Sequence, residues 1–200
     1  MPSSGSPARS PVRERLTRVL LLGACAVGVL LVVTTLTMRA LGIRAYRMPS
    51  DAMAPSILVG DWFWAQVLRP SDVRHGTIVI FRSPVGHTSA VKRVIGMPGD
   101  TLAMKAGVLT INGRVPQEPY LDSLGDCGGA PDSSRRNWGP VVIPTAEFFV
   151  LGDNRDCSID SRQFGPVARD SLKAQPWMVY FSYDADDLRI RWDRIGHRIR

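Results

Sequence analysis

The feature that most constrains this chain is an uncharged apolar run near its N-terminus, VLLLGACAVGVLLVVTTLTM, from Val19 to Met38. A helix of this length can cross the hydrocarbon core of a bilayer. Four arginines within residues 9–18 precede the run, and such positive flanks stay on the cytoplasmic side of a membrane. The sequence therefore predicts a membrane anchor with a cytoplasmic tail before it and an extracytoplasmic chain after it.

Two other interpretations of the run are a buried core helix and a cleaved signal peptide. The run exceeds the usual apolar core of a signal peptide. The segment that follows, RALGIRAYR, is basic and bulky and offers no convincing cleavage site. We therefore expect a basic cytoplasmic tail over residues 1–17, an anchor over 18–39 and an extracytoplasmic domain over 40–200. Residues 1–15, rich in Pro, Ser and Arg, are typical of a disordered tail.

The charge of the chain does not indicate a nucleic-acid surface. The formal net charge is +7, but the arginines are scattered, with only small concentrations at each end. Of the 25 basic residues, only Lys92, Lys105 and Lys173 are lysines. A chain that uses arginine almost everywhere has a chemical reason to keep a lysine where a proton must be released, because arginine cannot be deprotonated in a protein. The alternative is that Lys92 is an ordinary strand residue.

The part outside the membrane is predicted to be mainly antiparallel β structure in one domain. Short aromatic or β-branched segments, separated by Gly and Pro, are typical of such strands. Asn112-Gly113 is a strong hairpin-turn signal. No second helix is expected, and residues 122–140 are predicted to be an irregular surface insertion. The expected strands are residues 61–68, 77–83, 91–97, 101–113, 147–153, 177–183 and 188–195.

The three cysteines fit an oxidising compartment. Cys25 lies inside the apolar run, where it is a small apolar residue. Cys127 and Cys157 would both lie outside the cytoplasm and are candidates for a disulfide. The alternative is two separate buried thiols, since the sequence gives no distance between them.

The chemistry-bearing residues do not form a metal site, a cofactor site or a histidine-based triad. No HExxH motif, no paired Cys/His spacing and no phosphate loop occurs in the chain, so no metal or cofactor is expected. His75, His87 and His197 are dispersed and are interpreted as surface or turn residues. A buried lysine can replace histidine as the base that activates a serine.

Three segments resemble the motif boxes of bacterial type I signal peptidases, in the same order and with similar spacing. They are MPSDAMAPSILVGD, AVKRVIGMPGD and GDNRDCSIDSRQFGPV, behind a single anchor. The resemblance covers essentially the whole chain. It implies an antiparallel β domain of the signal-peptidase type and a serine endopeptidase with a Ser/Lys dyad. It also implies that the chain acts at the bilayer surface on signal peptides of secreted preproteins, which it binds as extended segments.

The resemblance also implies roles for individual residues. Lys92 matches the general base, and Ser158 matches the serine that hydrogen-bonds and orients it. Ser50 matches the hydroxyl that completes an oxyanion hole with the main-chain N–H of position 52. The strand leading into Ser50 and the one ending at Lys92 resemble those that hold substrate. Residues implied to be structural are the ion pairs Asp153 with Arg93 and Asp160 with Arg162, and the turn residues Met53 and Pro55.

One decisive position departs from the family pattern. The family's nucleophile stands two residues after Ser50, and here that residue is Ala52, whose methyl group cannot form an acyl-enzyme. Three other nucleophiles are conceivable: Ser50 itself, Ser56 and Cys157. Ser50 is displaced by two residues, Ser56 lies beyond a proline, and adjacent strand residues such as Cys157 and Ser158 point to opposite faces.

Two classes of function therefore remain. The first is a membrane-bound signal peptidase that is impaired or inactive as written, because Ala52 replaces the nucleophile. The second is a pseudo-peptidase that binds extended segments of secreted proteins without cutting them, as an assembly chaperone or scaffold. A weaker hypothesis is a peptidase for one dedicated secreted substrate. The sequence leaves open whether Ala52 is the natural residue or an introduced one.

Overall fold

The computed structural model describes residues 11–86, 88–121 and 133–200. His87, Cys127 and most of the predicted insertion lie outside these residues. The chain divides into two compact units, Met1–Gly42 and Ile43–Arg200, and each is described by itself.

The first unit is a single long helix, α1 (Pro11–Ala40). Residues 15–40 of this helix are apolar enough to cross a membrane, and no other helix in the described part of the chain qualifies. Its leucines and valines are exposed along its length, as expected for a helix whose apolar surface faces lipid. The helix begins earlier than expected: residues 11–15 are helical, so their assignment to a disordered tail is wrong. Proline is favoured at a first helical position because its missing N–H needs no partner there.

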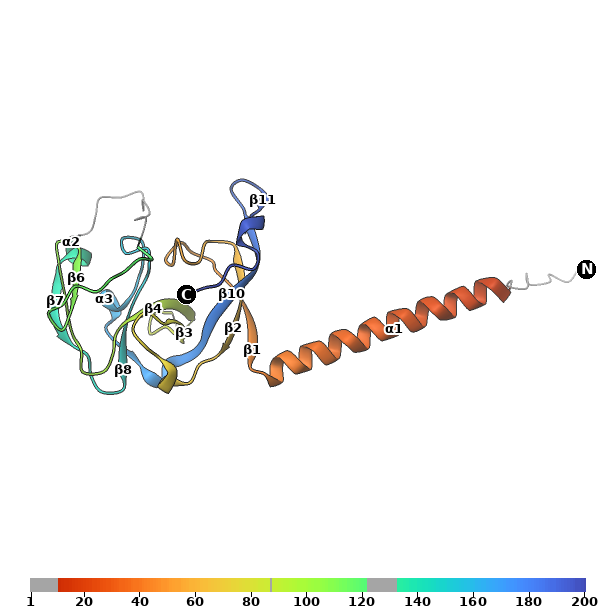
Figure 1. Cartoon of the computed structure of the whole chain (residues 1–200), viewed down its shortest axis with the longest axis horizontal. Coiled ribbons are helices and arrows are strands. Elements are labelled where there is room, and N and C mark those ends of the chain that lie inside the picture. Colours follow the sequence, from red (N-terminus) through yellow and green to blue (C-terminus); the bar gives the residue numbers. More distant parts are fainter. Residues whose placement is uncertain (1–10, 87, 122–132) are drawn as a thin grey trace, which may run out of the picture. The chain divides into compact units, whose positions relative to one another are not determined.

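The second unit is an antiparallel β domain built from two sheets (Figure 1). The larger sheet has eight strands in the order β1-β2-β10-β3-β4-β8-β9, with β11 paired to β10. The smaller sheet has the order β6-β5-β7. The strands of the larger sheet are β1 (Ile43–Arg47), β2 (Asp61–Val67), β3 (Ile78–Arg82), β4 (Ser89–Gly96), β8 (Glu147–Leu151), β9 (Val167–Ala168), β10 (Leu172–Asp184) and β11 (Arg189–Ile190); those of the smaller sheet are β5 (Thr101–Lys105), β6 (Val108–Ile111) and β7 (Trp138–Val142). The short helices are α2 (Ser133–Arg136) and α3 (Ser161–Phe164), with 3₁₀ turns η1 (Pro70–Asp72), η2 (Arg169–Ser171) and η3 (Trp192–Arg194).

The long strand β10 gives the larger sheet its curl. It pairs with β2 along one edge and with β3 along the other. Its register with β2 shifts twice, between Pro176 and Met178 and again between Val179 and Phe181. Such bulges bend a strand and increase its twist. The sheet therefore wraps around an apolar interior rather than lying flat.

The interior consists of three apolar clusters. One of them joins the loop after β1 to the sheet and contains Met48, Ala52, Met53 and Phe63. A second lies between β3, β4 and β8. The third joins the smaller sheet to β4 and β8. The residues of the loop at Ala52 are thus anchored by the same core that holds the strands.

The predicted strands at 61–68, 77–83, 91–97, 147–153 and 177–183 are confirmed as β2, β3, β4, β8 and part of β10. The predicted 101–113 segment is a hairpin whose turn is Ala106-Gly107. Asn112-Gly113 forms a second tight turn with positive φ at both residues, which closes a bridge between Ile111 and Arg114. The strands β7 and β9 were not predicted, and β1 was expected only as the strand leading into Ser50 that the family resemblance implies.

Three other expectations are wrong. The irregular insertion does not extend over residues 133–140, because α2 and the start of β7 lie there and Trp138 stacks on Phe149 at 5.2 Å. The expected absence of a second helix fails at the single turns α2 and α3. The expected strand over 188–195 pairs only at β11 and then turns into η3, because its arginine side chains are directed to the loop after β1.

Candidate active site

The loop between β1 and β2 carries Ser50 and Ala52. Its ends are closed by two main-chain bonds: Met48 N–H donates to Asp61 O (2.8 Å), and Gly60 N–H donates to Met48 O (3.0 Å). Ser50 is exposed, whereas Ala52 is only 6% exposed. The loop therefore presents position 52 from a fixed, largely buried backbone.

Two further predicted residues lie in this loop. Met53 is fully buried in the core cluster that includes Ala52. Pro55 follows a cis peptide bond. The structure therefore places both residues in the loop between β1 and β2, and their role in shaping the turn stays a prediction.

The loop is held in place by the buried carboxylate of Asp61, which the sequence analysis missed. Asp61 is fully buried and accepts hydrogen bonds from Ser182 Oγ (2.6 Å) and Arg194 Nη2 (2.5 Å). Arg194 Nη2 also donates to Ser56 O (3.1 Å), and Arg191 donates to Val59 O (3.0 Å). The only sequence signal for this network is the arginine-rich RIRWDRI segment, whose alternating pattern instead predicts a strand.

Lys92 lies in the middle of β4, paired with Val79 of β3. The strand continues to Gly96, so the expectation that it ends at Lys92 is wrong. Lys92 is buried, with 6% of its surface exposed. Burial is the main cause that lowers the pKa of Lys92 from 10.5 to about 8; Arg162 lowers it further, while the carboxylates of Asp160, Asp153 and Asp51 oppose the shift. A lysine with this pKa is partly neutral near neutral pH and can accept a proton.

The segment after β8 brings Ser158 next to Ala52. Gly152 is the contact point: a Cβ atom there would lie 2.3 Å from Ser158 Oγ and 2.5 Å from the carbonyl oxygen of Ala52. Asn154 N–H donates to the same carbonyl (3.2 Å). Only a glycine allows these two segments to approach so closely.

The expected hydrogen bond between Ser158 and Lys92 is not formed. Ser158 is fully buried, and its Oγ has no hydrogen-bond partner among the described residues. Asn154 Oδ1 is likewise buried without a partner among them. Two buried polar atoms thus stand unsatisfied near Ala52, which is unusual in a folded domain and typical of a functional site.

Two buried ion pairs flank this region. Arg93 binds Asp153 with both ends of its guanidinium, Nε to Oδ1 at 2.8 Å and Nη2 to Oδ2 at 2.7 Å. Arg162 forms the same bidentate pair with Asp160, Nε to Oδ1 and Nη2 to Oδ2, each at 2.8 Å. Asp160 also accepts from Gly152 N–H (3.1 Å). The ion pairs therefore fix both β4 and the segment after β8.

The smaller sheet and its connections add two contacts that the sequence analysis missed. Arg135 of α2 donates to the carbonyls of Asp156 (2.8 Å) and Ser158 (3.0 Å). Glu118 forms a short ion pair with Arg155. The QEPY segment that contains Glu118 carried no recognisable signal on its own.

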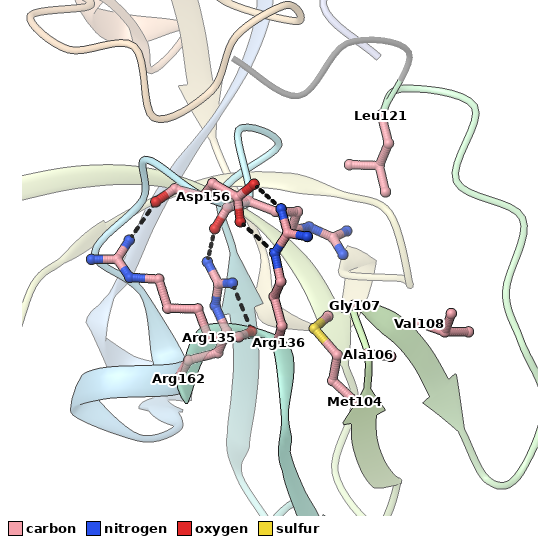
Figure 2. A pocket seen from close by; sticks show the side chains of 10 residues that line it. Met104, Ala106, Gly107, Val108, Leu121, Arg135, Arg136, Asp156 and Arg162 are labelled. Atoms are coloured by element: carbon pink, nitrogen blue, oxygen red, sulfur yellow. Dashed lines mark hydrogen bonds and ion pairs between the residues drawn. The ribbon is translucent and has the colours of Figure 1, made fainter. Parts of the chain in front are cut away.

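A cavity of about 270 Å³ lies beside the segment after β8. Figure 2 shows the side chains that line it. Four arginines, Asp156 and apolar residues of β5 and β6 form its walls. Among the predicted site residues only Arg162 lines it, and neither Lys92 nor Ala52 does. The cavity is therefore separate from the predicted catalytic residues.

Among the residues that the structure describes, the cysteines and His75 supply no further catalytic or metal-binding group to this site. Cys157 is disulfide-bonded and Cys25 is free. Because Cys127 lies outside the described residues, its pairing with Cys157 stays a prediction. His75 hydrogen-bonds Asp100 (2.7 Å), and within residues 11–86, 88–121 and 133–200 no group of His, Cys, Asp and Glu is arranged to hold a metal ion.

A buried lysine, a fixed loop at position 52 and two buried arginine–carboxylate pairs on a curled antiparallel sheet are the features that the resemblance to type I signal peptidases implies, and the comparisons with known proteins point to the same family. The model of the family described as signal peptidase, peptidase S26, matches residues 19–181. The chain belongs to this family.

Two relatives, both signal peptidases I of Bacillus species, support the same assignment by sequence. Signal peptidase I of Bacillus licheniformis is 31% identical over 160 residues, which cover 78% of this chain and 86% of that protein. Signal peptidase I T of Bacillus subtilis is 32% identical over 160 residues, 78% of this chain and 83% of that protein. A crystal structure of a signal peptidase I from Enterococcus faecalis is 31% identical and covers 52% of this chain and 96% of that chain, with a TM-score of 0.46.

Proposed function

We propose that this chain is a membrane-anchored signal peptidase of the Ser/Lys type that binds signal peptides but does not cleave them, because Ala52 occupies the nucleophile position. The observation that carries the proposal is the buried Lys92 with its pKa lowered to about 8, in a site whose ion pairs are complete. Burying a lysine in such surroundings costs stability, and groups with pKa values perturbed in this way cluster at functional sites.

In this proposal Lys92 is the general base that would take the proton from a hydroxyl at position 52. The main-chain N–H of residue 52 and the Ser50 hydroxyl form the oxyanion hole, and Ser158 orients the lysine. The unsatisfied Ser158 Oγ is consistent with a hydrogen bond that forms only when the missing hydroxyl or a substrate is present. With a methyl group at position 52, no covalent intermediate forms.

The three other nucleophiles are each disfavoured by their surroundings. The Ser56 hydroxyl accepts a hydrogen bond from Arg93 Nη2 (3.2 Å), which lowers its basicity and holds it on that arginine. Cys157 is disulfide-bonded and has no thiolate to offer. Ser50 is exposed and is assigned to the oxyanion hole.

The proposed substrates are signal peptides of secreted preproteins, bound in extended form by main-chain pairing. The N-terminal helix is proposed to anchor the chain in the cell membrane, with the tail in the cytoplasm and the β domain outside it. No cofactor, metal or nucleic acid enters the proposal. Orientation rests on the arginines that precede the apolar run.

The test is preprotein cleavage by the full-length chain in detergent or vesicles. The chain as written should leave a signal-peptide-bearing preprotein intact, and Ala52→Ser should cleave it. Ala54→Ser is the matched control, since it adds a hydroxyl to the same loop at a position to which the proposal gives no catalytic role. Equal cleavage by the chain as written and by the Ala52→Ser variant would contradict the assignment of position 52. An inert Ala52→Ser variant would contradict the assignment of the whole site.

A second candidate function is a pseudo-peptidase that holds extended segments of secreted proteins. The observation in its favour is that the buried base and both ion pairs are retained, whereas position 52 carries an alanine. Photo-crosslinking of the chain as written to an exported protein, in cells that have an active signal peptidase, would support this role. Loss of the crosslink when Ala52→Ser begins to turn over substrate would assign the crosslinked segment to the site at position 52.

A further inference from the structure

Tyr120 and Glu118 lie between β6 and the undescribed residues 122–132, outside all three motif boxes. They nevertheless contact arginines from two of those boxes. The Tyr120 ring lies against the Arg93 guanidinium, with Cζ 3.8 Å from the ring centroid. Tyr120 Oη donates to Glu118 (2.7 Å), and Glu118 binds Arg155.

The stacked ring completes the surroundings of Arg93. The guanidinium has five N–H donors in one plane. Besides the two bonds to Asp153, these donors reach Ser56 Oγ, Gly76 O (2.7 Å) and Arg200 O (3.1 Å). With the edge of the group saturated, only its two faces remain to be covered, and Tyr120 covers one of them.

The Glu118 side of the contact reaches the backbone beside Ser158. Arg155 Nε donates to Gly152 O (3.1 Å), and Gly152 is the residue that touches both Ser158 and the Ala52 carbonyl. Tyr120 and Glu118 thus hold β4 through Arg93 and the segment after β8 through Arg155. These are the two chain segments that carry Lys92 and Ser158.

We infer that Tyr120 is a positioning residue for the Lys92 base and acts through Arg93. The inference rests on the proposed function for its catalytic meaning. The stacked ring keeps Arg93 locked on Asp153, so that the Asp153 carboxylate is neutralised by arginine rather than by the lysine ammonium. It also keeps water away from this part of the buried site.

The charged groups that act on Lys92 make the direction of the effect clear. Asp160, Asp153 and Asp51 favour its ammonium form, whereas burial and Arg162 disfavour it. Loosening Arg93 leaves Asp153 less compensated and lets water enter. Both changes favour the ammonium form and raise the pKa of Lys92 from about 8 toward 10.5.

The first experiment uses the full-length chain with Ala52 retained, so it does not depend on activity. Lysines are labelled by reductive dimethylation with ¹³C, and their NMR signals are followed through a pH titration. In Tyr120→Leu the Lys92 signal should titrate about 1 pH unit higher than in the parent. Tyr120→Phe keeps the ring and should leave the Lys92 titration at its parental value, while Tyr183→Leu controls for the loss of a half-exposed tyrosine elsewhere.

The second experiment measures cleavage against pH in the Ala52→Ser background. A rise of about 1 in the pKa reduces the neutral fraction of Lys92 at pH 8 from about one half to about one tenth, so Tyr120→Leu should be about fivefold slower there and recover at higher pH. A purely structural role would lower the amount of folded protein without moving the pH profile.

The outcomes separate this inference from the proposed function. An inert Ala52→Ser variant contradicts the proposed function and leaves the NMR titration as the deciding test of Tyr120. A folded Tyr120→Leu variant in which the Lys92 signal titrates at the parental pH overturns the inference. So does a Tyr120→Phe variant in which the Lys92 titration moves as far as it does in Tyr120→Leu. Should Tyr120→Leu fail to fold, Tyr120→Met offers a longer and more adaptable side chain of similar volume, also without an aromatic face, and is read by the same criterion.

Discussion

Replacing Lys92 with methionine should make the folded domain more stable at neutral pH. The side chain is buried, and burial lowers the pKa of Lys92 from 10.5 to about 8. A pKa difference of this size corresponds to roughly 3 kcal/mol of differential free energy between the charged lysine in the unfolded and folded states. Methionine has a similar length and no charge, so Lys92→Met should recover about 2–3 kcal/mol at pH 7.

The sign of the pH dependence follows from proton binding. Between pH 8 and 10.5 the unfolded chain binds a proton at Lys92 that the folded chain releases, so stability rises with pH over this window. Below pH 8 both states are protonated and the destabilisation is fully present. The stability advantage of Lys92→Met should therefore be greatest at pH 7 and decrease steadily as the pH approaches 10.5.

The assay is urea unfolding of the full-length chain in detergent micelles, followed by tryptophan fluorescence. All five tryptophans lie beyond residue 60, so the signal reports on the β domain and not on the helix. Lys105→Met is the matched control, because Lys105 is exposed on β5 and its replacement should change stability by less than about 0.5 kcal/mol. A Lys92→Met variant that is equally or less stable than the parent at pH 7, or an advantage that does not change with pH, would refute the buried-base description.

Three further predictions concern stability, packing and topology. Arg162→Gln leaves the buried Asp160 carboxylate unpaired and should lower the free energy of unfolding in urea by about 3–5 kcal/mol. Arg189→Gln, whose ion pair is exposed, should lower it by less than about 1 kcal/mol, and similar losses in the two variants would contradict the structure. Gly152→Ala forces a Cβ atom against Ser158, so it should lower the free energy of unfolding by about 1–3 kcal/mol and abolish cleavage by the Ala52→Ser form. Unchanged stability would show that the contact is not tight. A cysteine introduced within residues 1–10 should resist impermeant thiol reagents in intact cells, and labelling from outside would reverse the proposed orientation.

Several features of the chain could be predicted because their causes are local. The apolar run is uncharged over the length of a bilayer, and this alone predicts the helix. Strand β2 alternates buried and exposed residues from Asp61 to Ala65, a pattern written in neighbouring residues. The Asn112-Gly113 turn follows from the ease with which these two residue types adopt positive φ.

Other features could not be predicted because their causes are distant in sequence. Asp61 binds Arg194 across 133 positions, and this contact turns an expected strand into η3. Strand β7 exists because Trp138 finds Phe149 in the third apolar cluster, although its own residues resemble an irregular segment. A pattern within one segment cannot show which partner another segment will supply.

The candidate site divides in the same way. The sequence by itself determined the residue types: a lysine in a chain that otherwise favours arginine, the paired acidic and basic residues of the boxes, and an alanine at the position that the family resemblance matches to the nucleophile. Only the tertiary structure decided that Lys92 is buried enough to lower its pKa and that Ser158 Oγ lacks a partner among the described residues. Only it placed Tyr120 on Arg93. The physical reason is that desolvation and hydrogen-bond satisfaction depend on what the curled sheet packs around a group, and those neighbours come from strands far apart in the chain.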